Sequence, residues 1–390
     1  MAMKILILHP IQDVLAGSTK ALLNIVSQSK RYGVDIIVGV PGRGALNEAL
    51  DALYIPHINL NFRFSVLPNK HSLWQDILLI RRYIVNSIAG IRLAWYARKH
   101  HIDIIHSNVS VIDVGYIASR LAHIPHIYHI REYGEKDFGW QHYVGKSRFL
   151  NRLNLTEQYN ICITKDIQHY VQQDVNPHSI VIYDGVLSIN AIHYCSQKEP
   201  YFLFAGRLLP AKGIMLLLQA YSMYCTLRTN PIPLHIAGDT NDMEYKAQLL
   251  HIVETNHLED KVSFLGMRND VISLMQETIA LIVPSRSEGF GFITTEAMFS
   301  GCLVIGNDVA GTKEQFDNGQ RLTEKEIGLR YTTQEQLVQH LLDITESVHN
   351  NTFTHMYEPM ILRGQRVVKQ LYTTECNAEQ IYQFYKNITQ

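Results

Sequence analysis

IALIVPSRSEGFGFITTEAM, residues 279–298, joins an apolar run to a turn and then to a helical pattern. Ile279–Val283 predicts a buried strand, and Gly289 and Gly291 give the turn a backbone that can approach a ligand closely. The helix beyond offers unpaired N–H groups and a positive partial charge. Glu296 lies in its first turns, where a carboxylate can accept hydrogen bonds from a diol such as ribose or cap the helix. A strand, a glycine turn and a helix in this order are typical of a parallel α/β sheet.

FAGRLLPAKG, residues 204–213, has a similar form about 80 residues earlier. A strand ends in Gly206 and Arg207, and Lys212 and Gly213 precede a helical pattern. Arginine offers a planar fork to phosphate oxygens and lysine a compact charge. Together they could hold a diphosphate and stabilise it as a leaving group, although a cationic pair is also common on a solvated surface.

The same alternation of short β-branched runs with helical patterns extends through the whole chain. It begins with a strand over residues 4–9 and breaks between residues 185 and 200, where the polar stretch Ser196–Pro200 predicts a linker. We therefore expect two Rossmann-like, doubly wound domains facing each other across a cleft. The predicted boundaries are 1–190, 191–370 and a C-terminal helix, 371–390, that crosses back to the first domain.

Composition limits the class of protein. The 390 residues are 46% hydrophobic and 18% charged, and five widely spaced cysteines argue against a disulfide scaffold or a zinc-finger site. No apolar run is long enough to cross a bilayer and the start does not resemble a signal peptide, so we expect a cytoplasmic protein. The net charge of −1 does not suggest nucleic-acid binding. Residues 1–190 hold 19 Lys/Arg against 14 Asp/Glu, which gives a basic first half and an acidic second half.

The two quoted motifs resemble those of the retaining glycosyltransferases of family 4, which have the GT-B fold. Glu288 and Glu296 match the family's Glu-x7-Glu motif, and Gly206, Arg207, Lys212 and Gly213 match its G-R-x-x-x-x-K-G motif. Further matches are VIYDGV at 181–186, IAG at 236–238, VSFLG at 262–266, GCLVI at 301–305 and AGTKE at 310–314. The resemblance is specific over 181–314 and weaker over 1–180.

The resemblance implies a role for each matching residue. Arg207 and Lys212 would bind the donor diphosphate, and Glu296 the ribose. Glu288 and the amides from Gly289 to Phe292 would bind the donor sugar. The remaining donor-binding candidates are Gly17, Gly238, Gly266, Met267, Phe290 and Gly291. The family needs no metal or other cofactor, and UDP or GDP is the expected nucleotide.

The chain departs from the family pattern at three places. Many members carry an active-site histidine at a strand end where this chain has Arg131, and His129 lies two residues earlier on the same strand face. The departure leaves open whether Arg131, His129 or neither touches the transferred sugar, and an Arg131–Glu132 surface pair is the alternative. The first loop has Gly17 alone where the family has two glycines, and Phe292 replaces an arginine.

The acceptor side is predicted from composition. Residues 132–152 form an aromatic, basic stretch that we expect to be a loop suited to a glycan or to a polyprenyl-diphosphate-linked acceptor, or an ordered surface cap. His106, Ser107 and Asn108 end another strand. The helical pattern at 73–99 carries apolar residues and several basic ones. It suits either packing on the sheet or contact with the inner surface of the cytoplasmic membrane.

Three function classes follow from these features. The first is a retaining hexosyltransferase of capsule, O-antigen or exopolysaccharide biosynthesis. The second is a nucleotide-sugar 2-epimerase on the same fold, and the third a non-catalytic sugar-nucleotide-binding protein. A Rossmann dehydrogenase is disfavoured because no G-x-G-x-x-G follows the first strand.

Overall fold

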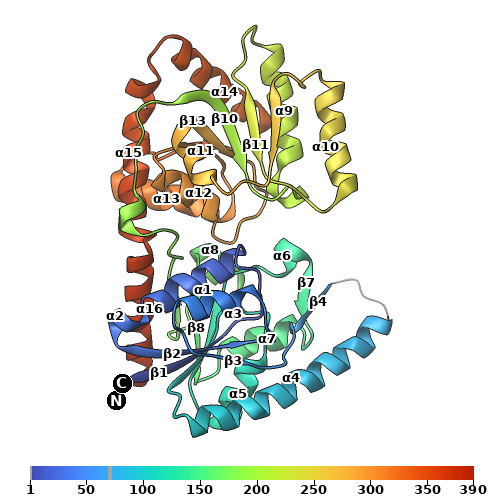
Figure 1. Ribbon diagram of the computed structural model, residues 1–390, viewed down its shortest axis with the longest axis vertical. Coiled ribbons are helices and arrows are strands. Elements are labelled where there is room, and N and C mark those ends of the chain that lie inside the picture. The colour runs from blue at the N-terminus through green and yellow to red at the C-terminus, as the bar shows by residue number, and fades with distance from the viewer. Residues whose placement is uncertain (1, 69–72) are drawn as a thin grey trace. The chain divides into compact units, whose positions relative to one another are not determined.

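The computed structural model describes residues 2–68 and 73–390, except the side chains of residues 73–76 and Phe138. The chain divides into two compact units (Figure 1). Unit 1 comprises Met1–Val186 together with Thr374–Gln390, and unit 2 comprises Leu187–Thr373.

Unit 1 is built on a parallel seven-stranded sheet in the order β3-β2-β1-β5-β6-β8-β9. Its strands are β1 (Met3–Leu8), β2 (Val34–Val40), β3 (His57–Asn59), β5 (Ile104–Ser107), β6 (His126–Ile130), β8 (Gln158–Cys162) and β9 (Ser179–Val181). Its helices are α1 (Gly17–Ser27), α2 (Ser29–Tyr32), α3 (Ala45–Ala52), α4 (Leu73–Lys99), α5 (Val114–Ala122), α6 (Glu135–Phe138), α7 (Lys146–Leu153), α8 (Lys165–Tyr170) and α16 (Thr374–Thr389). Buried Ile, Leu and Val side chains form a core on each face of the sheet, as fully covered parallel strands require.

The stretch 132–152 is not the loop predicted from its composition. It holds α6, the strand β7 (Trp140–His142) and α7, and β7 pairs antiparallel with β4 (Val66–Pro68). Gly134, Gly139 and Gly145 have φ values of 71°, 62° and 84°. These left-handed positions favour glycine, and they cut the stretch into elements too short for the sequence pattern to reveal.

Unit 2 is built on a parallel six-stranded sheet in the order β12-β11-β10-β13-β14-β15. Its strands are β10 (Glu199–Ala205), β11 (Leu234–Ala237), β12 (Val262–Gly266), β13 (Thr278–Val283), β14 (Leu303–Asn307) and β15 (Leu329–Tyr331). Its helices are η1 (Ile189–Ala191), η2 (Pro210–Lys212), α9 (Ile214–Thr226), α10 (Met243–Thr255), α11 (Val271–Glu277), α12 (Phe292–Phe299), α13 (Ala310–Thr323), α14 (Gln334–His349) and α15 (Phe353–Leu371). Because β10 begins at Glu199, the predicted polar linker ends inside the first strand of this sheet.

In each sheet the order in which strands are added reverses once, between β1 and β5 in unit 1 and between β10 and β13 in unit 2. In each case the chain first adds strands on one side and then returns to add strands on the other. Ligands of doubly wound sheets bind outside the carboxyl ends of the strands at such a switch point. The two switch points therefore define where to look for functional side chains.

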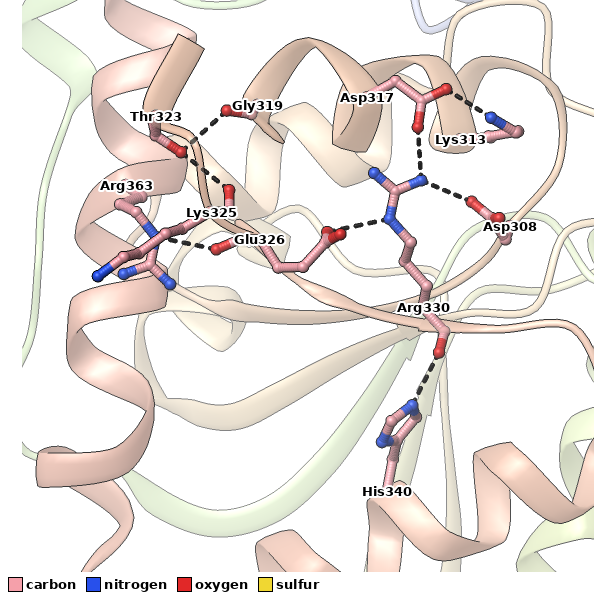
Figure 2. A network of polar contacts seen from close by, with 10 residues as sticks. All are labelled: Asp308, Lys313, Asp317, Gly319, Thr323, Lys325, Glu326, Arg330, His340 and Arg363. Carbon is pink, nitrogen blue, oxygen red and sulfur yellow. Dashed lines mark hydrogen bonds and ion pairs between the residues drawn. The ribbon is translucent and has the colours of Figure 1, made fainter. Parts of the chain in front are cut away.

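The edge strand β15 is fixed by an ionic network around Arg330 (Figure 2). The guanidinium contacts Asp308 at 2.9 Å, Asp317 at 2.7 Å and Glu326 at 3.0 Å. His340 on α14 bonds the carbonyl oxygen of Arg330 at 2.8 Å. These contacts tie β15 to α13 and α14, so we assign the network a structural role.

The α16 helix belongs to unit 1 although it follows all of unit 2 in the sequence. Tyr382 stacks on Tyr32 with ring centroids 4.7 Å apart and donates a hydrogen bond to the carbonyl oxygen of Ile25 at 2.7 Å. Ile381 and Tyr385 are fully buried in the same core. The predicted return of the C-terminal helix to the first domain is confirmed.

Candidate functional site

The switch point of unit 2 brings the two strongest sequence motifs together. The stretch from Gly206 to Lys212 follows β10, and the stretch from Pro284 to Gly291 follows the neighbouring strand β13. Arg286 donates its backbone N–H to the carbonyl oxygen of Ala211 at 2.9 Å, which joins the two loops. Residues about 80 positions apart in the sequence thus share one sheet edge.

Two glycines make this close approach possible. At Gly213, where φ is 70°, an added Cβ would lie 1.8 Å from the carbonyl oxygen of Pro284. At Gly238, where φ is 152°, it would lie 1.9 Å from the carbonyl oxygen of Gly206. A side chain at either position would push the backbone of the neighbouring loop away, so both motifs depend on these glycines.

Lys212 and Glu288 form an ion pair at the centre of this edge. Lys212 Nζ lies 2.5 Å from Glu288 Oε1, and Ser285 Oγ donates to the same oxygen at 2.8 Å. The lysine and glutamate side chains are 27% and 11% exposed. The lysine predicted to bind diphosphate and the glutamate predicted to bind the sugar therefore lie next to each other.

Arg207 lies on the same loop as Lys212, with its side chain exposed to solvent. Its side chain is exposed and, among the described residues, forms no hydrogen bond or ion pair. A guanidinium that the fold leaves unneutralised retains its full capacity to bind an anion. Arg207 and Lys212 together give this edge a cationic character, partly offset by Glu288.

Apart from Gly17, which begins α1 in unit 1, the other predicted donor residues lie on the same sheet edge or on α12. Gly291, with φ of 92°, precedes α12, and Gln315 donates to the carbonyl oxygens of Phe290 and Gly291 at 2.7 and 3.1 Å. These bonds fix the loop that leads into the helix N-terminus. Glu296 is half-buried on α12. Phe292 packs its ring against Phe290, with centroids 5.6 Å apart.

Gly266 and Met267 occupy the end of β12, two strands away from the switch point. Gly266 has φ of 66° with open space beside it, and the Met267 side chain is 66% exposed. An exposed thioether next to an open glycine offers an apolar surface for a flat ring.

The switch point of unit 1 holds a buried polar network centred on Arg131. The guanidinium pairs with Asp184 and donates to Asn108 O at 2.9 Å and to Asn108 Oδ1 at 3.1 Å. It also contacts His129 Nδ1 at 3.2 Å, so the two residues do share a strand face. Asn108 in turn contacts His9 Nδ1 at 3.0 Å. Arg131 therefore does not form the surface pair with Glu132.

Burial keeps the histidines of this network neutral. Burial, with the nearby positive charge of Arg131, lowers the pKa of His9 to about 3. The same two causes lower the pKa values of His106 and His129 well below the ordinary histidine value. His106 Nδ1 lies 2.6 Å from the hydroxyl of Tyr385 on α16, and its ring stacks on that of His129.

The sequence pattern missed two members of this network, His9 and Tyr385. His9 follows β1, and its Nε2 lies 3.0 Å from Thr19 Oγ1, close to the predicted Gly17 at the start of α1. The position of His9 directly after the first strand was the available signal. No signal in the sequence pointed to Tyr385, because only the tertiary fold brings α16 back to this sheet.

A pocket in unit 1 lies beside the end of β6. It is partly open to solvent and is lined by Glu132, Tyr133, Trp140, His142, Lys146 and Tyr170, together with apolar side chains. Glu132 accepts hydrogen bonds from the amide and hydroxyl of Ser110 at 2.9 and 2.6 Å. Burial raises the pKa of Glu132 in spite of those bonds. Aromatic walls with a held carboxylate suit a ligand that carries hydroxyl groups.

Two searches of the described residues found nothing. Residues 2–68 and 73–390 contain no group of three or more His, Cys, Asp and Glu side chains placed to hold a metal ion. Within the same part of the chain, no helix is long and apolar enough to cross a membrane.

Comparison with known proteins places residues 189–350 in the family described as Glycosyl transferases group 1. The chain is 29% identical over 217 residues to the uncharacterized glycosyltransferase MJ1178 of Methanocaldococcus jannaschii, which covers 55% of this chain and 58% of that protein. It is 33% identical over 141 residues to the O-antigen chain mannosyltransferase RfbU of Salmonella typhimurium, covering 36% and 38%.

A third curated relative acts on a lipid-linked glycan, according to its name. It is the N-acetylgalactosamine-N,N'-diacetylbacillosaminyl-diphospho-undecaprenol 4-alpha-N-acetylgalactosaminyltransferase of Campylobacter jejuni, 29% identical over 131 residues and covering 33% of this chain and 34% of that protein. All three alignments span less than two thirds of the relative's length.

Among solved structures, Anabaena Alr3699/HepE in complex with UDP superposes with a TM-score of 0.78. The identity is 22%, and the match covers 99% of this chain and 100% of HepE. The likeness establishes the GT-B fold, with its two Rossmann-like domains, as the fold of this chain.

Proposed function

Residues 189–350 belong to the group 1 glycosyltransferases, and on this premise we propose that the protein is a retaining glycosyltransferase. It transfers a sugar, of the hexose type, from a nucleotide-diphosphate sugar to a glycan acceptor in polysaccharide biosynthesis. The observation that carries the proposal is the Lys212–Glu288 ion pair at the switch point of unit 2, with Arg207 exposed on the same loop as Lys212.

The donor diphosphate suits the cationic part of this edge. Arg207 and Lys212 neutralise the charge that grows on the diphosphate as the bond to the sugar breaks, which is where fixed charges contribute most to rate. Lys212 is already held at 2.5 Å from Glu288, so its ammonium needs little reorganisation. No metal is required for this neutralisation, since the two side chains and the α12 N-terminus supply it.

The placement of the remaining residues supports the other donor contacts that we propose. Glu288 accepts hydrogen bonds from sugar hydroxyls with its second carboxylate oxygen, since Oε1 is taken by Lys212 and Ser285. Glu296 accepts from the ribose diol. Met267, exposed beside Gly266, covers the base. UDP is the first nucleotide to test because HepE was solved with UDP, and GDP is the second.

The acceptor is assigned to unit 1. The aromatic pocket with Glu132 and Lys146 suits a glycan, and Lys146 suits the diphosphate of a lipid-linked acceptor. The Campylobacter relative, named for an undecaprenyl-diphosphate acceptor, supports this choice. Arg131 is nearly buried and fully engaged by Asp184, Asn108 and His129, so we assign it a positioning role.

Calorimetric titration of the purified chain with UDP, GDP and ADP, without added metal, tests the donor site. We expect one nucleotide to bind at micromolar concentration and Arg207→Ala to weaken that binding at least tenfold. Arg366→Ala removes an equally charged, exposed arginine from α15 of the same unit and should leave binding unchanged. Absence of binding to all three nucleotides, or equal binding by Arg207→Ala, would refute the site.

Turnover separates the alternative functions. With the matching nucleotide sugar and a lipid-linked glycan, we expect an elongated product and a large loss of kcat in Glu288→Gln. An epimerised sugar nucleotide formed without acceptor would favour the epimerase. Tight donor binding with no product from any acceptor would favour a non-catalytic binding protein.

A further inference from the structure

The long helix α4 exposes a continuous row of large apolar side chains. Ile77, Ile80, Ile84, Ile88, Ile91 and Trp95 are between 48% and 63% exposed, and we call them the apolar stripe. They are spaced three or four residues apart, so they line one face of the helix. Scattered exposed apolar residues are ordinary on a protein surface, but a row along most of one helix marks an interaction site.

The opposite face of α4 is the one that packs on unit 1. Asn86, Ala89, Leu93 and Ala97 are buried, and an added Cβ on Gly90 would lie 2.5 Å from the Ile117 side chain of α5. Figure 1 shows α4 at the margin of its unit, beside α5. Because these buried residues lie on the helix face opposite the stripe, the apolar stripe points away from the core.

Over residues 77–102 the charge beside the stripe has one sign. Arg81, Arg92 and Lys99 are exposed and each lies four residues after a stripe residue, so the three form a cationic row along one flank. The Lys99 ammonium lies 4.8 Å from the centre of the Trp95 ring. Residues 77–102 contain no Asp or Glu. No acidic side chain among the described residues pairs with Arg81 or Arg92.

We propose that the apolar stripe and its cationic row bind the surface of an anionic lipid bilayer. The helix would lie in the plane of the interface, with the isoleucines and Trp95 at the boundary of headgroups and acyl chains and the cations among the headgroup phosphates. Tryptophan and the long stems of Arg and Lys suit that boundary. The helix does not cross the bilayer, in keeping with the search of the described helices for membrane spans.

Charge selects a bilayer over a second copy of the chain as the occupant. Two stripes placed face to face would bring two cationic rows together, and residues 77–102, which hold both rows, contain no Asp or Glu to neutralise them. An anionic lipid surface supplies the missing negative charge. The inference rests on α4 alone and holds whether or not the protein transfers a sugar.

Flotation with vesicles tests the proposal in the absence of any sugar nucleotide. We expect the full chain to float with vesicles of phosphatidylcholine and phosphatidylglycerol but not with phosphatidylcholine alone, and to be released by salt. Ile84→Gln/Ile88→Gln and Arg81→Gln/Arg92→Gln should each weaken binding at least tenfold. The matched controls Leu250→Gln/Leu322→Gln and Lys325→Gln/Arg366→Gln change equally exposed residues of unit 2 and should bind like wild type.

Three outcomes would overturn the inference. One is failure of the wild-type chain to float, and another is unchanged flotation of both α4 variants. The third is a concentration-dependent dimer in sedimentation that Ile84→Gln/Ile88→Gln dissociates, which would make a second copy the occupant. Far-UV circular dichroism of each variant shows that lost binding is not lost fold. Nucleotide titration of the same variants separates this result from the donor-site test.

Discussion

Arg131 and Asp184 form an ion pair whose side chains are only 4% and 2% exposed. Taking two charges out of water is costly, and the pair is tolerated because Asn108 and His129 occupy the other guanidinium nitrogens. Removing one member leaves the other charged, buried and unpaired. The pair is therefore a weak point of unit 1 as much as a support for the switch point.

We expect Arg131→Met to lower the free energy of unfolding by about 3–5 kcal/mol, the usual cost of an orphaned buried charge. Urea unfolding at pH 7.5 measures the change. The double variant Arg131→Met/Asp184→Leu should recover part of the loss because it removes the orphaned carboxylate as well. A single variant as stable as wild type would show that the pair is not charged in the fold.

The fold lowers the pKa of His126. Its burial lowers its pKa to about 4, although its hydrogen bond to Gln158 at 2.7 Å opposes the shift. The unfolded chain takes up the proton near pH 6.5, so this contribution to stability is full above pH 6.5 and is lost as pH falls toward 4. His9 behaves in the same way down to about pH 3.

As the pH falls from 6 to 4.5, we expect the free energy of unfolding to decrease less steeply in His126→Gln than in wild type. The two slopes should differ by about 1.4 kcal/mol per pH unit. Urea unfolding of wild type and variant across this range gives the two slopes. Burial raises the pKa values of Glu132 and Asp184, which acts in the opposite direction, but equally in both proteins. Parallel slopes would mean that His126 is protonated in the folded state.

At the scale of elements, the loops that follow β10 and β13 depend on contact between backbones. Gly213 sits between η2 and α9 with no room for a side chain against Pro284, whereas Gly266 has a similar φ and open space beside it. Replacing each glycine by alanine therefore distinguishes the cost of backbone strain, which both positions share, from the cost of steric overlap, which arises only at Gly213.

We expect Gly213→Ala to cost about 2–5 kcal/mol, the sum of left-handed strain and overpacking. Gly266→Ala should cost only the strain, about 1–2 kcal/mol. Thermal unfolding compares the two. Equal costs would show that the loop after β13 yields to the added methyl group, and that the close approach does not hold Lys212 beside Glu288.

At the scale of the molecule, unit 1 is completed by the last segment of the chain. Deleting residues 374–390 would expose the surface that Ile381, Tyr382 and Tyr385 cover. Each buried side chain of this size contributes about 1.5–3 kcal/mol, and the total approaches the stability of a whole domain. We expect unit 1 of the truncated chain to be rapidly proteolysed while unit 2 resists. A chain lacking only residues 387–390, which are mostly exposed, is the control.

The sequence by itself determined the α/β class, both parallel sheets and the two motifs of unit 2, because strand and helix periodicities and glycine positions are local properties. It also placed Arg131 and His129 on one strand face, since alternation along a strand requires no tertiary information. The predicted donor roles rest on residue type and stay predictions.

Only the tertiary structure decided which residues meet. Asp184 reaches Arg131, Tyr385 reaches His106 and Lys212 reaches Glu288 across separations of 53, 279 and 76 positions. Sheet order sets such pairs, and one chain's residue pattern does not encode distance in space. The short elements within 132–152 and the exposed apolar stripe of α4 likewise emerged only from the tertiary structure. Whether an apolar residue is buried or exposed depends on the partners that the whole fold brings to it.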